Sequence, residues 1–156
     1  NLDYIRMGCF QSKISKNTEI KHKPLYDCNY KNTEKFTFNE MLFFAKVVKV
    51  YDGDTCTVVF FFNGDNYRFN IRMSGYDSPE LRSKDPVEKK YAKMSQKILS
   101  DLILNKKVIL YCKDFDKYGR IMGVIELNGQ NINQHMLTYG HCRIYNGGHK
   151  EPWIFE

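Results

Sequence analysis

No stretch of this sequence approaches the roughly 18 consecutive apolar residues that a membrane-spanning helix needs, and no secretory signal opens it. It also lacks any CxxC pair. Its four histidines form no paired-ligand spacing with the cysteines, which argues against a zinc site. We therefore expect free, reduced thiols and an intracellular, cytoplasmic location. The cysteines are Cys9, Cys28, Cys56, Cys112 and Cys142.

The composition predicts a folded chain with an anionic partner. Apolar residues make up 42% and aromatic residues 15%, enough for a core, which argues against global disorder. A length of 156 residues favours one domain with a tail over two small domains. The formal charge of +6 and the pI near 9.0 suit nucleic acid or an acidic membrane surface, although charge alone selects neither.

The pattern of apolar and polar residues changes near residue 42. Residues 1–41 are polar and have no sustained helical or strand period, so we expect an N-terminal extension that is poorly ordered or packs loosely on the domain. Clear periodic patterns begin at residue 42, and residues 42–156 are predicted to form one folded domain.

Periodicity predicts five strands and two helices. Asp-Gly and Asn-Gly turns join the first three strands into an antiparallel meander. An amphipathic helix of about five turns follows, with an apolar stripe at Val87, Tyr91, Met94, Ile98 and Leu102. Residues 132–139 predict a short second helix that Gly140 ends. The predicted strands are 42–50, 55–62, 66–73, 107–112 and 120–127.

This order of elements is typical of an OB-fold, an α+β fold in which five strands form a barrel. A helix lies between strands 3 and 4 and, in this chain, a short helix follows strand 5. Such barrels often bind oligonucleotides or oligosaccharides on one face. The fold alone does not determine the function.

Charged residues gather in loops and at strand ends, where a rigid barrel could direct them to one place. Asp54 is the least expected of them. It stands where a strand should begin, although Asp52 and Gly53 already provide the turn and strands are depleted in Asp. The group also includes Arg72, the segment 77–80 and Arg120. Each feature alone has an ordinary explanation as a turn, a loop or a solvated strand residue.

Together these groups have the chemistry that phosphodiester hydrolysis needs. Two carboxylates, Asp54 and Asp77, with a backbone carbonyl make a sparse hard-oxygen site that suits Ca²⁺. Arg72 and Arg120 supply planar guanidinium forks that match a phosphate. Glu80 supplies a carboxylate that can hold or deprotonate a water.

Three motifs carry a family resemblance. They are DGDT (52–55), RMSGYDSPE (72–80) and DKYGR (116–120). The domain resembles the staphylococcal nuclease (thermonuclease) family, which has a DGDT turn, an R-x₄-D-[ST]-P-E segment and a D-K-Y-G-R segment. The similarity runs from about Ala45 to about Lys150. It implies an OB barrel and Ca²⁺-dependent hydrolysis of DNA and RNA that leaves 3′-phosphate ends.

The resemblance also implies a metal site. Asp54 and Asp77 would ligate Ca²⁺ together with the Ser78 carbonyl, and Asp52 matches an acid that reaches the metal only through water. Ser78 replaces the Thr of the best-known members. We expect little consequence, because the ligand is a backbone carbonyl.

Catalytic and substrate-binding positions carry over in the same way. Glu80 would be the general base or orient the water, and Arg72 and Arg120 would bind and neutralise the scissile phosphate. Lys117 and Tyr118 match positions that contact a terminal phosphate of the nucleotide.

A non-catalytic reading stays open. The same barrel could be a nucleic-acid-binding or protein-interaction module, as in the degenerate copies within Tudor-staphylococcal-nuclease proteins. Degenerate copies lose the acids and arginines first, so their presence here favours an enzyme. We expect DNA and RNA as its substrates and, separately, a monomer. The retained residues are Asp54, Arg72, Asp77, Glu80 and Arg120.

A separate pattern concerns the membrane. MGCFQS (7–12) fits the N-myristoylation motif M-G-x-x-x-[ST], with Cys9 beside Gly8 as a site for a second acyl chain. If Met7 is the initiator, the sequence predicts a membrane-anchored N-terminus at Gly8. If it is not, the hexapeptide is accidental.

Overall fold

The computed structural model describes residues 24–155 of a chain that divides into two compact units, 1–36 and 37–156. In the first unit, the described part has a short 3₁₀ helix, η2 (Leu25–Asp27), and a turn in which the Asn29 side chain accepts hydrogen bonds from backbone N–H groups. The predicted acylation residues Gly8 and Cys9 lie outside the described residues. Acylation therefore stays a prediction from the sequence.

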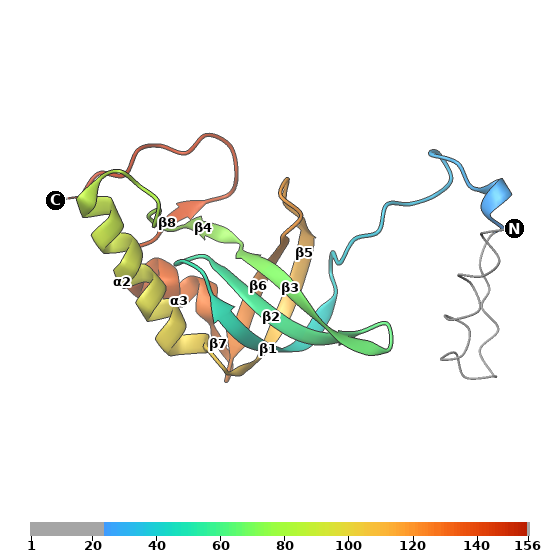
Figure 1. Ribbon diagram of the computed structural model, residues 1–156, viewed down its shortest axis with the longest axis horizontal. Coiled ribbons are helices and arrows are strands. Elements are labelled where there is room, and N and C mark those ends of the chain that lie inside the picture. Colours follow the sequence, from blue (N-terminus) through green and yellow to red (C-terminus); the bar gives the residue numbers. More distant parts are fainter. Residues whose placement is uncertain (1–23, 156) are drawn as a thin grey trace, which may run out of the picture. The chain divides into compact units, whose positions relative to one another are not determined.

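The second unit is a closed barrel with two helices (Figure 1). Its main sheet has the order β3-β2-β1-β5-β6-β7, and a parallel pairing of β3 with β6 closes it; β4 and β8 form a separate two-stranded sheet. The elements are β1 (Leu42–Val50), β2 (Thr55–Phe62), β3 (Asp65–Met73), β4 (Gly75–Asp77), α2 (Pro86–Ile103), β5 (Lys107–Phe115), β6 (Ile121–Leu127), β7 (Gln130–Asn131), α3 (Ile132–Tyr139) and β8 (Arg143–Tyr145).

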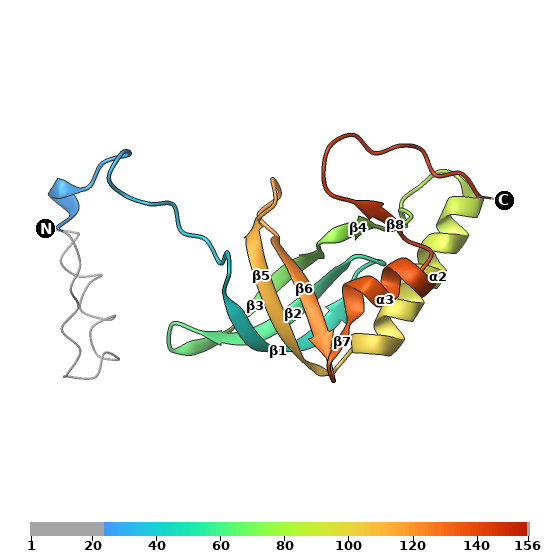
Figure 2. The ribbon, with the colours of Figure 1, turned by 180° about the vertical axis from the view of Figure 1, so that it is seen from behind.

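Both helices lie side by side at one end of the barrel, in front and rear views alike (Figures 1 and 2). The α2 helix begins where Asp85 accepts a hydrogen bond from the Val87 N–H and Pro86 opens the first turn. Asn131 caps α3 in the same way through the Gln134 N–H. Within residues 24–155, no helix combines the length and hydropathy that a membrane crossing requires.

The predicted fold is confirmed, with local corrections. All five predicted strands and both helices are present in the predicted order. The fourth strand continues past residue 112 to Phe115, and the fifth begins at Ile121 rather than at 120. Two three-residue strands, β4 and β8, were not predicted. They are too short to show a period of two, and each forms only because the other lies beside it.

The apolar stripe predicted for α2 is confirmed only in part: Ile98 and Leu102 pack against the core, but the fully buried positions lie one residue further along. Val87 and Met94 of that stripe are 48% and 39% exposed. The helix instead packs with small residues near its middle, which let it approach the barrel loops closely. The buried residues of α2 are Ala92, Ser95, Leu99 and Ile103.

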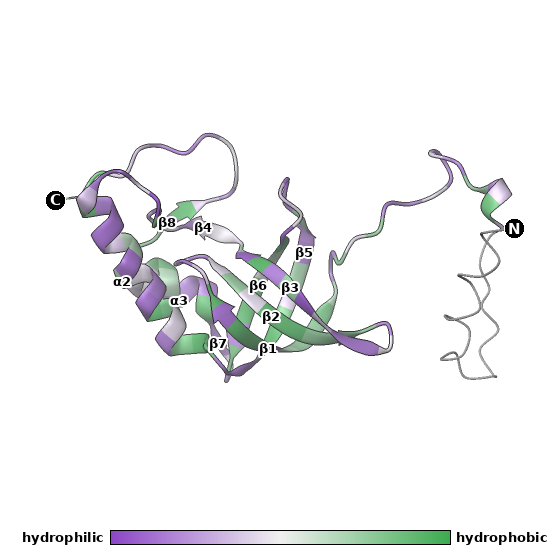
Figure 3. Ribbon diagram, in the orientation of Figure 1, coloured by the Kyte–Doolittle hydropathy of each residue, from purple (hydrophilic) through white to green (hydrophobic). Residues whose placement is uncertain are grey.

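The barrel core contains an aromatic cluster centred on Phe38. This side chain is 2% exposed, and five other phenylalanine rings lie with centroids 5.0–5.8 Å from its own. Most residues of β2 are hydrophobic (Figure 3), and buried and half-buried positions alternate along much of β2 and β6. The folded unit therefore includes Phe38, whereas the sequence analysis assigned residues up to 41 to the extension.

The four cysteines in the described part of the chain are free, as predicted. Burial, with a smaller contribution from the charge of Asp52, raises the pKa of Cys56 to about 12. Burial likewise raises the pKa of Cys142 to about 12. Both thiols therefore stay protonated at neutral pH and are poor nucleophiles.

Replacing Phe38 by Ala should destabilise the barrel by about 3–5 kcal/mol, because it leaves a cavity among packed aromatic rings. Urea unfolding measures the change. Phe44→Ala is the control, since Phe44 is 81% exposed and its loss should cost less than about 0.5 kcal/mol. Equal effects of the two substitutions would show that Phe38 is not part of the core.

Candidate active site

The loop between β1 and β2 presents Asp54 at one end of the barrel. The backbone N–H groups of Tyr51 and Asp52 donate to the Thr55 carbonyl, at 2.8 and 3.4 Å, and the Asp54 N–H donates to Asp52 Oδ1 at 3.1 Å. From the end of β3, the Met73 N–H donates to the Asp54 carbonyl at 2.8 Å. The position of Asp54 is thus fixed from two strands.

Gly53 is needed in this loop for space. A Cβ at this position would lie 2.7 Å from the Cβ of Ser95 on α2 and 2.8 Å from the Cβ of Ser78. The loop therefore fits between the helix and the segment after β4, and only glycine allows this.

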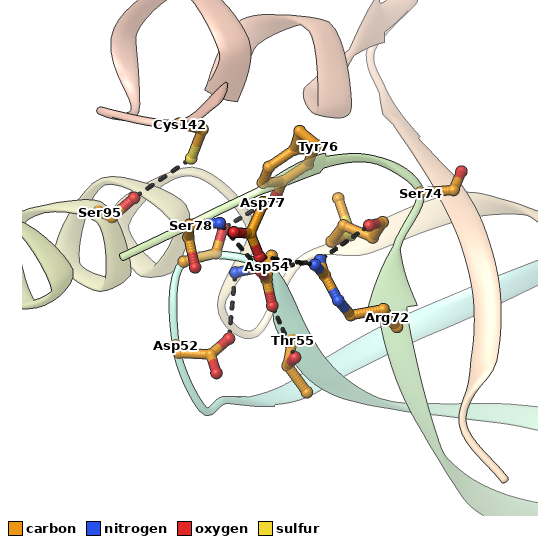
Figure 4. Close-up of polar contacts among 12 residues, drawn as sticks. Asp52, Asp54, Thr55, Arg72, Ser74, Tyr76, Asp77, Ser78, Ser95 and Cys142 are labelled. Atoms are coloured by element: carbon orange, nitrogen blue, oxygen red, sulfur yellow. Dashed lines mark hydrogen bonds and ion pairs between the residues drawn. The ribbon is translucent and has the colours of Figure 1, made fainter. Parts of the chain in front are cut away.

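Arg72 joins two acids that are far apart in the sequence (Figure 4). Its Nη1 lies 2.8 Å from Asp54 Oδ2 and its Nη2 lies 3.2 Å from Asp77 Oδ1. Nη1 also donates to the Met73 carbonyl at 3.1 Å. Arg72 is 8%, Asp54 5% and Asp77 0% exposed, so the three charges form a buried network.

Asp54 has two further partners. The Ser78 N–H donates to its Oδ2 at 3.0 Å, and the Thr55 hydroxyl donates to its Oδ1 at 2.9 Å. These bonds orient the carboxylate, and the bond from Ser78 links the loop before β2 to the segment after β4. The predicted site residues Asp54, Arg72, Asp77 and Ser78 therefore come together.

Asp77 is also contacted by two cations from the end of the described chain. Arg143 Nη2 lies 3.1 Å from Asp77 Oδ2, and Lys150 Nζ lies 2.7 Å from Asp77 Oδ1. Lys150 Nζ reaches Glu80 Oε1 as well, at 2.9 Å. Partial burial lowers the pKa of Lys150, but hydrogen bonds to Asp77 and Glu80 outweigh this and raise it. Neither cation was assigned a role from the sequence.

Glu80 is held at its backbone by the first turn of α2. Its N–H donates to Glu88 Oε1 at 3.0 Å, and the other oxygen of Glu88 accepts from the Ser83 hydroxyl at 2.6 Å. The Glu80 side chain stays 55% exposed. It is therefore the accessible carboxylate of the group.

The loop between β5 and β6 brings Arg120 to the same end of the barrel. Arg120 Nε lies 2.6 Å from Asp116 Oδ2, and Nη1 donates to the Thr55 hydroxyl at 3.3 Å. The guanidinium carbon lies 5.4 Å from the Tyr118 ring centroid, and Lys117 Nζ lies 5.0 Å from the same centroid. Thr55 thus connects Arg120 to Asp54.

These groups surround an open cavity of about 860 Å³. Asp77 and Ser78 do not line it; they are buried, at 0% and 2% exposure, and reach it through their contacts with Arg72 and Asp54. The predicted site residues that do line the cavity are Asp54, Arg72, Glu80, Lys117, Tyr118 and Arg120.

Sequence comparison decides the family. A profile described as "Staphylococcal nuclease homologue" matches residues 70–152, which include Arg72, Asp77, Glu80 and Arg120. The chain belongs to the staphylococcal nuclease family. Asp54 lies before the matched region.

Curated relatives include several nucleases. The chain is 33% identical over 108 residues to an uncharacterised endonuclease of Haemophilus influenzae, covering 69% of this chain and 56% of that protein. It is 36% identical over 85 residues to a "probable staphylococcal-like nuclease" of Oryza sativa subsp. japonica, covering 54% and 22%. It is 32% identical over 100 residues to a thermonuclease of Staphylococcus hyicus, covering 63% and 57%. The chain thus spans little more than half of these bacterial relatives and about a fifth of the rice protein.

This staphylococcal nuclease domain has few oxygen donors that could ligate a metal ion. Residues 24–155 contain no group of three or more His, Cys, Asp or Glu side chains arranged to hold a metal ion. The Asp54 and Asp77 carboxylates and the Ser78 carbonyl are nevertheless hard oxygen donors, which is the type that Ca²⁺ prefers. The donor set fits a weakly held Ca²⁺ completed by water and substrate oxygens.

Asp52 carries a strongly perturbed carboxyl group. Burial, followed by the charge of Asp54, raises the pKa of Asp52 from 3.8 to about 7. Because the pKa is raised on folding, Asp52 favours the folded state below its unfolded pKa. This stabilisation is lost as the pH rises from about 4 through 7.

Asp52→Asn should therefore stabilise the chain more at pH 8 than at pH 5, by about 1–2 kcal/mol, because the amide cannot ionise. Urea unfolding in EGTA at both values measures the difference. Asp101→Asn is the control, since the Asp101 side chain is 64% exposed and pairs only with Lys97 on the surface of α2. If Asp52→Asn has the same effect at both pH values, the Asp52 pKa lies near 3.8 after all.

Proposed function

We propose that this chain is a Ca²⁺-dependent nuclease that hydrolyses phosphodiester bonds of DNA and RNA and leaves 3′-phosphate ends. One observation carries the proposal. Two arginines, Arg72 and Arg120, and an accessible carboxylate, Glu80, line one cavity together with the acid Asp54. The staphylococcal nuclease family and the nuclease relatives support the same class of reaction.

The two arginines are proposed to bind the scissile phosphate. A guanidinium has five N–H donors in a plane. For Arg120, the contacts with Asp116 and Thr55 use Nε and Nη1, so the group is oriented and keeps donors for a phosphate. Arg72 is fixed by Asp54 and Asp77 at the base of the cavity. Fixed donors stabilise negative charge that develops on the phosphoryl oxygens without a cost for reorientation.

Glu80 is proposed to position or deprotonate the attacking water. Its Oε1 accepts from Lys150, and its side chain is more than half exposed at the cavity. A carboxylate that is fixed at one oxygen can direct a water with the other.

Asp54, Asp77 and the Ser78 carbonyl are the residues that would hold Ca²⁺. When bound, the ion would supply positive charge next to the phosphate. Lys117 and Tyr118, beside Arg120 at the mouth of the cavity, are proposed to contact a neighbouring phosphate of the substrate. The net charge of +6 suits this polyanion.

The deciding experiment is incubation of the purified chain with 5′-labelled single-stranded DNA and with RNA, in Ca²⁺ and in EGTA. We expect cleavage only in Ca²⁺, with 3′-phosphate ends that phosphatase removes. Binding without cleavage in either buffer would contradict the proposal and favour a non-catalytic nucleic-acid-binding module. Products with 3′-hydroxyl ends would contradict the proposed bond.

Arg120→Lys should lower the turnover at least about a hundredfold, because lysine cannot offer the bidentate fork. The initial rate of DNA cleavage measures this, and circular dichroism checks the fold. Arg68→Lys on β3 is the matched control: it is exposed, does not line the cavity, and should leave the rate unchanged. A normal rate for Arg120→Lys would remove Arg120 from the mechanism.

A further inference from the structure

The segment from Arg143 to Phe155 folds back onto Asp77, the buried acid of the site. It begins as β8, which pairs with β4 so that Arg143 lies directly opposite Asp77 in the antiparallel ladder. The chain then loops away and returns toward the start of α2 (Figures 1 and 2), where the Phe155 ring stacks on Tyr91 with centroids 4.5 Å apart.

A bend at two glycines returns Lys150 to the site. Gly147 and Gly148 have φ values of 100° and 97°, a region that side chains other than glycine rarely adopt. The Tyr145 hydroxyl donates to the Gly148 carbonyl at 2.8 Å across this bend, and Lys150 Nζ lies 5.8 Å from the Tyr145 ring centroid.

Contacts beyond Lys150 hold the segment in place. The Arg143 guanidinium carbon lies 4.1 Å from the ring centroid of Trp153, and Arg143 Nη1 donates to the Pro152 carbonyl at 3.3 Å. Trp153 in turn stacks on Phe155. The segment is thus fixed on both sides of Lys150, and this places one ammonium group between Asp77 and Glu80.

The three acids linked by this network are matched in number by their cation partners. Asp54, Asp77 and Glu80 carry three negative charges. Their cation partners carry three positive charges; these partners are Arg72, Arg143 and Lys150.

The acceptor capacity of Asp77 is also largely used. A carboxylate has about four lone-pair positions, and three on Asp77 accept from a guanidinium or an ammonium group. Oδ1 receives both Arg72 and Lys150. A divalent ion that shares this oxygen must therefore displace one of the two cations.

Lys150 is the cation that can leave most readily. Its side chain is 40% exposed, and it keeps Glu80 as a partner when it releases Asp77. The Arg72 side chain is only 10% exposed, and its departure would remove the ion-pair partner of Asp54 as well. Arg143 is 26% exposed and is held by Pro152 and Trp153.

We propose that Lys150 competes with the divalent ion for Asp77, so that it is a positioning residue that sets the metal affinity of the site. This inference rests on the proposed metal site at Asp54 and Asp77. Lys150 pairs with Asp77 until a divalent ion binds, and then remains at the cavity through Glu80. The segment from Arg143 to Phe155 is thereby part of the proposed active site.

Calorimetric titration of the full chain with Ca²⁺ tests the proposal. Lys150→Met removes the charge and keeps most of the side-chain length, so the apparent Kd for Ca²⁺ should fall about fivefold to tenfold. Lys150→Arg keeps a cation and should restore a value within about twofold of the original chain. Lys97→Met is the control, because it removes an equal charge from an exposed ion pair on α2.

Emission of Trp153, the one tryptophan of the sequence, gives an independent readout. Ca²⁺ should change this emission in the original chain, because Lys150 moves within the segment that carries Trp153, and it should change it less in Lys150→Met.

The outcomes separate the two proposals. If Ca²⁺ binds but Lys150→Met leaves its affinity unchanged or weakens it, the competition is overturned and the metal site stands. If no variant binds Ca²⁺, both the metal site and the competition are overturned.

Discussion

The ion pairs of Arg72 with Asp54 and Asp77 are the interaction on which the site depends. They tie the loop before β2 and the strand β4 to the end of β3, at the position where β3 pairs with β6 and closes the barrel. Removal of one partner from a buried pair of this kind typically costs about 3–5 kcal/mol, because the remaining charge stays buried. The three charges therefore help to fix the geometry at this end of the barrel.

The buried network separates inaccessible charges from accessible ones. Asp77 is fully buried and organises cations around it, whereas Glu80 and Tyr118 remain exposed at the cavity. Arg120 joins the network only indirectly, through Thr55. In the proposed nuclease, the buried acids would position the arginines, and the exposed groups would contact the substrate.

Much of the fold could be predicted from the sequence, because the alternation of apolar and polar residues, Asx-Gly turns and capping residues are local signals.

The site could be predicted only in part. The acids and arginines stood in recognisable motifs, but no local pattern shows that β4 and β8 pair or that a bend at two glycines returns Lys150 to Asp77. The buried face of α2 was misplaced by one residue, because hydrophobicity alone does not mark the small residues Ala92 and Ser95 as buried. Long-range pairing and close approach depend on three-dimensional contact, which periodicity does not contain.

The proposed function requires that one phosphate of the substrate contacts both Arg72 and Arg120 in the cavity. A crystal structure of the chain with Ca²⁺ and a short single-stranded DNA that carries a non-hydrolysable phosphonate linkage tests it directly. The account predicts that the phosphonate oxygens lie within about 3.2 Å of nitrogen atoms of both Arg72 and Arg120. An oligonucleotide bound on another face of the barrel, with both arginines free of it, would contradict the account.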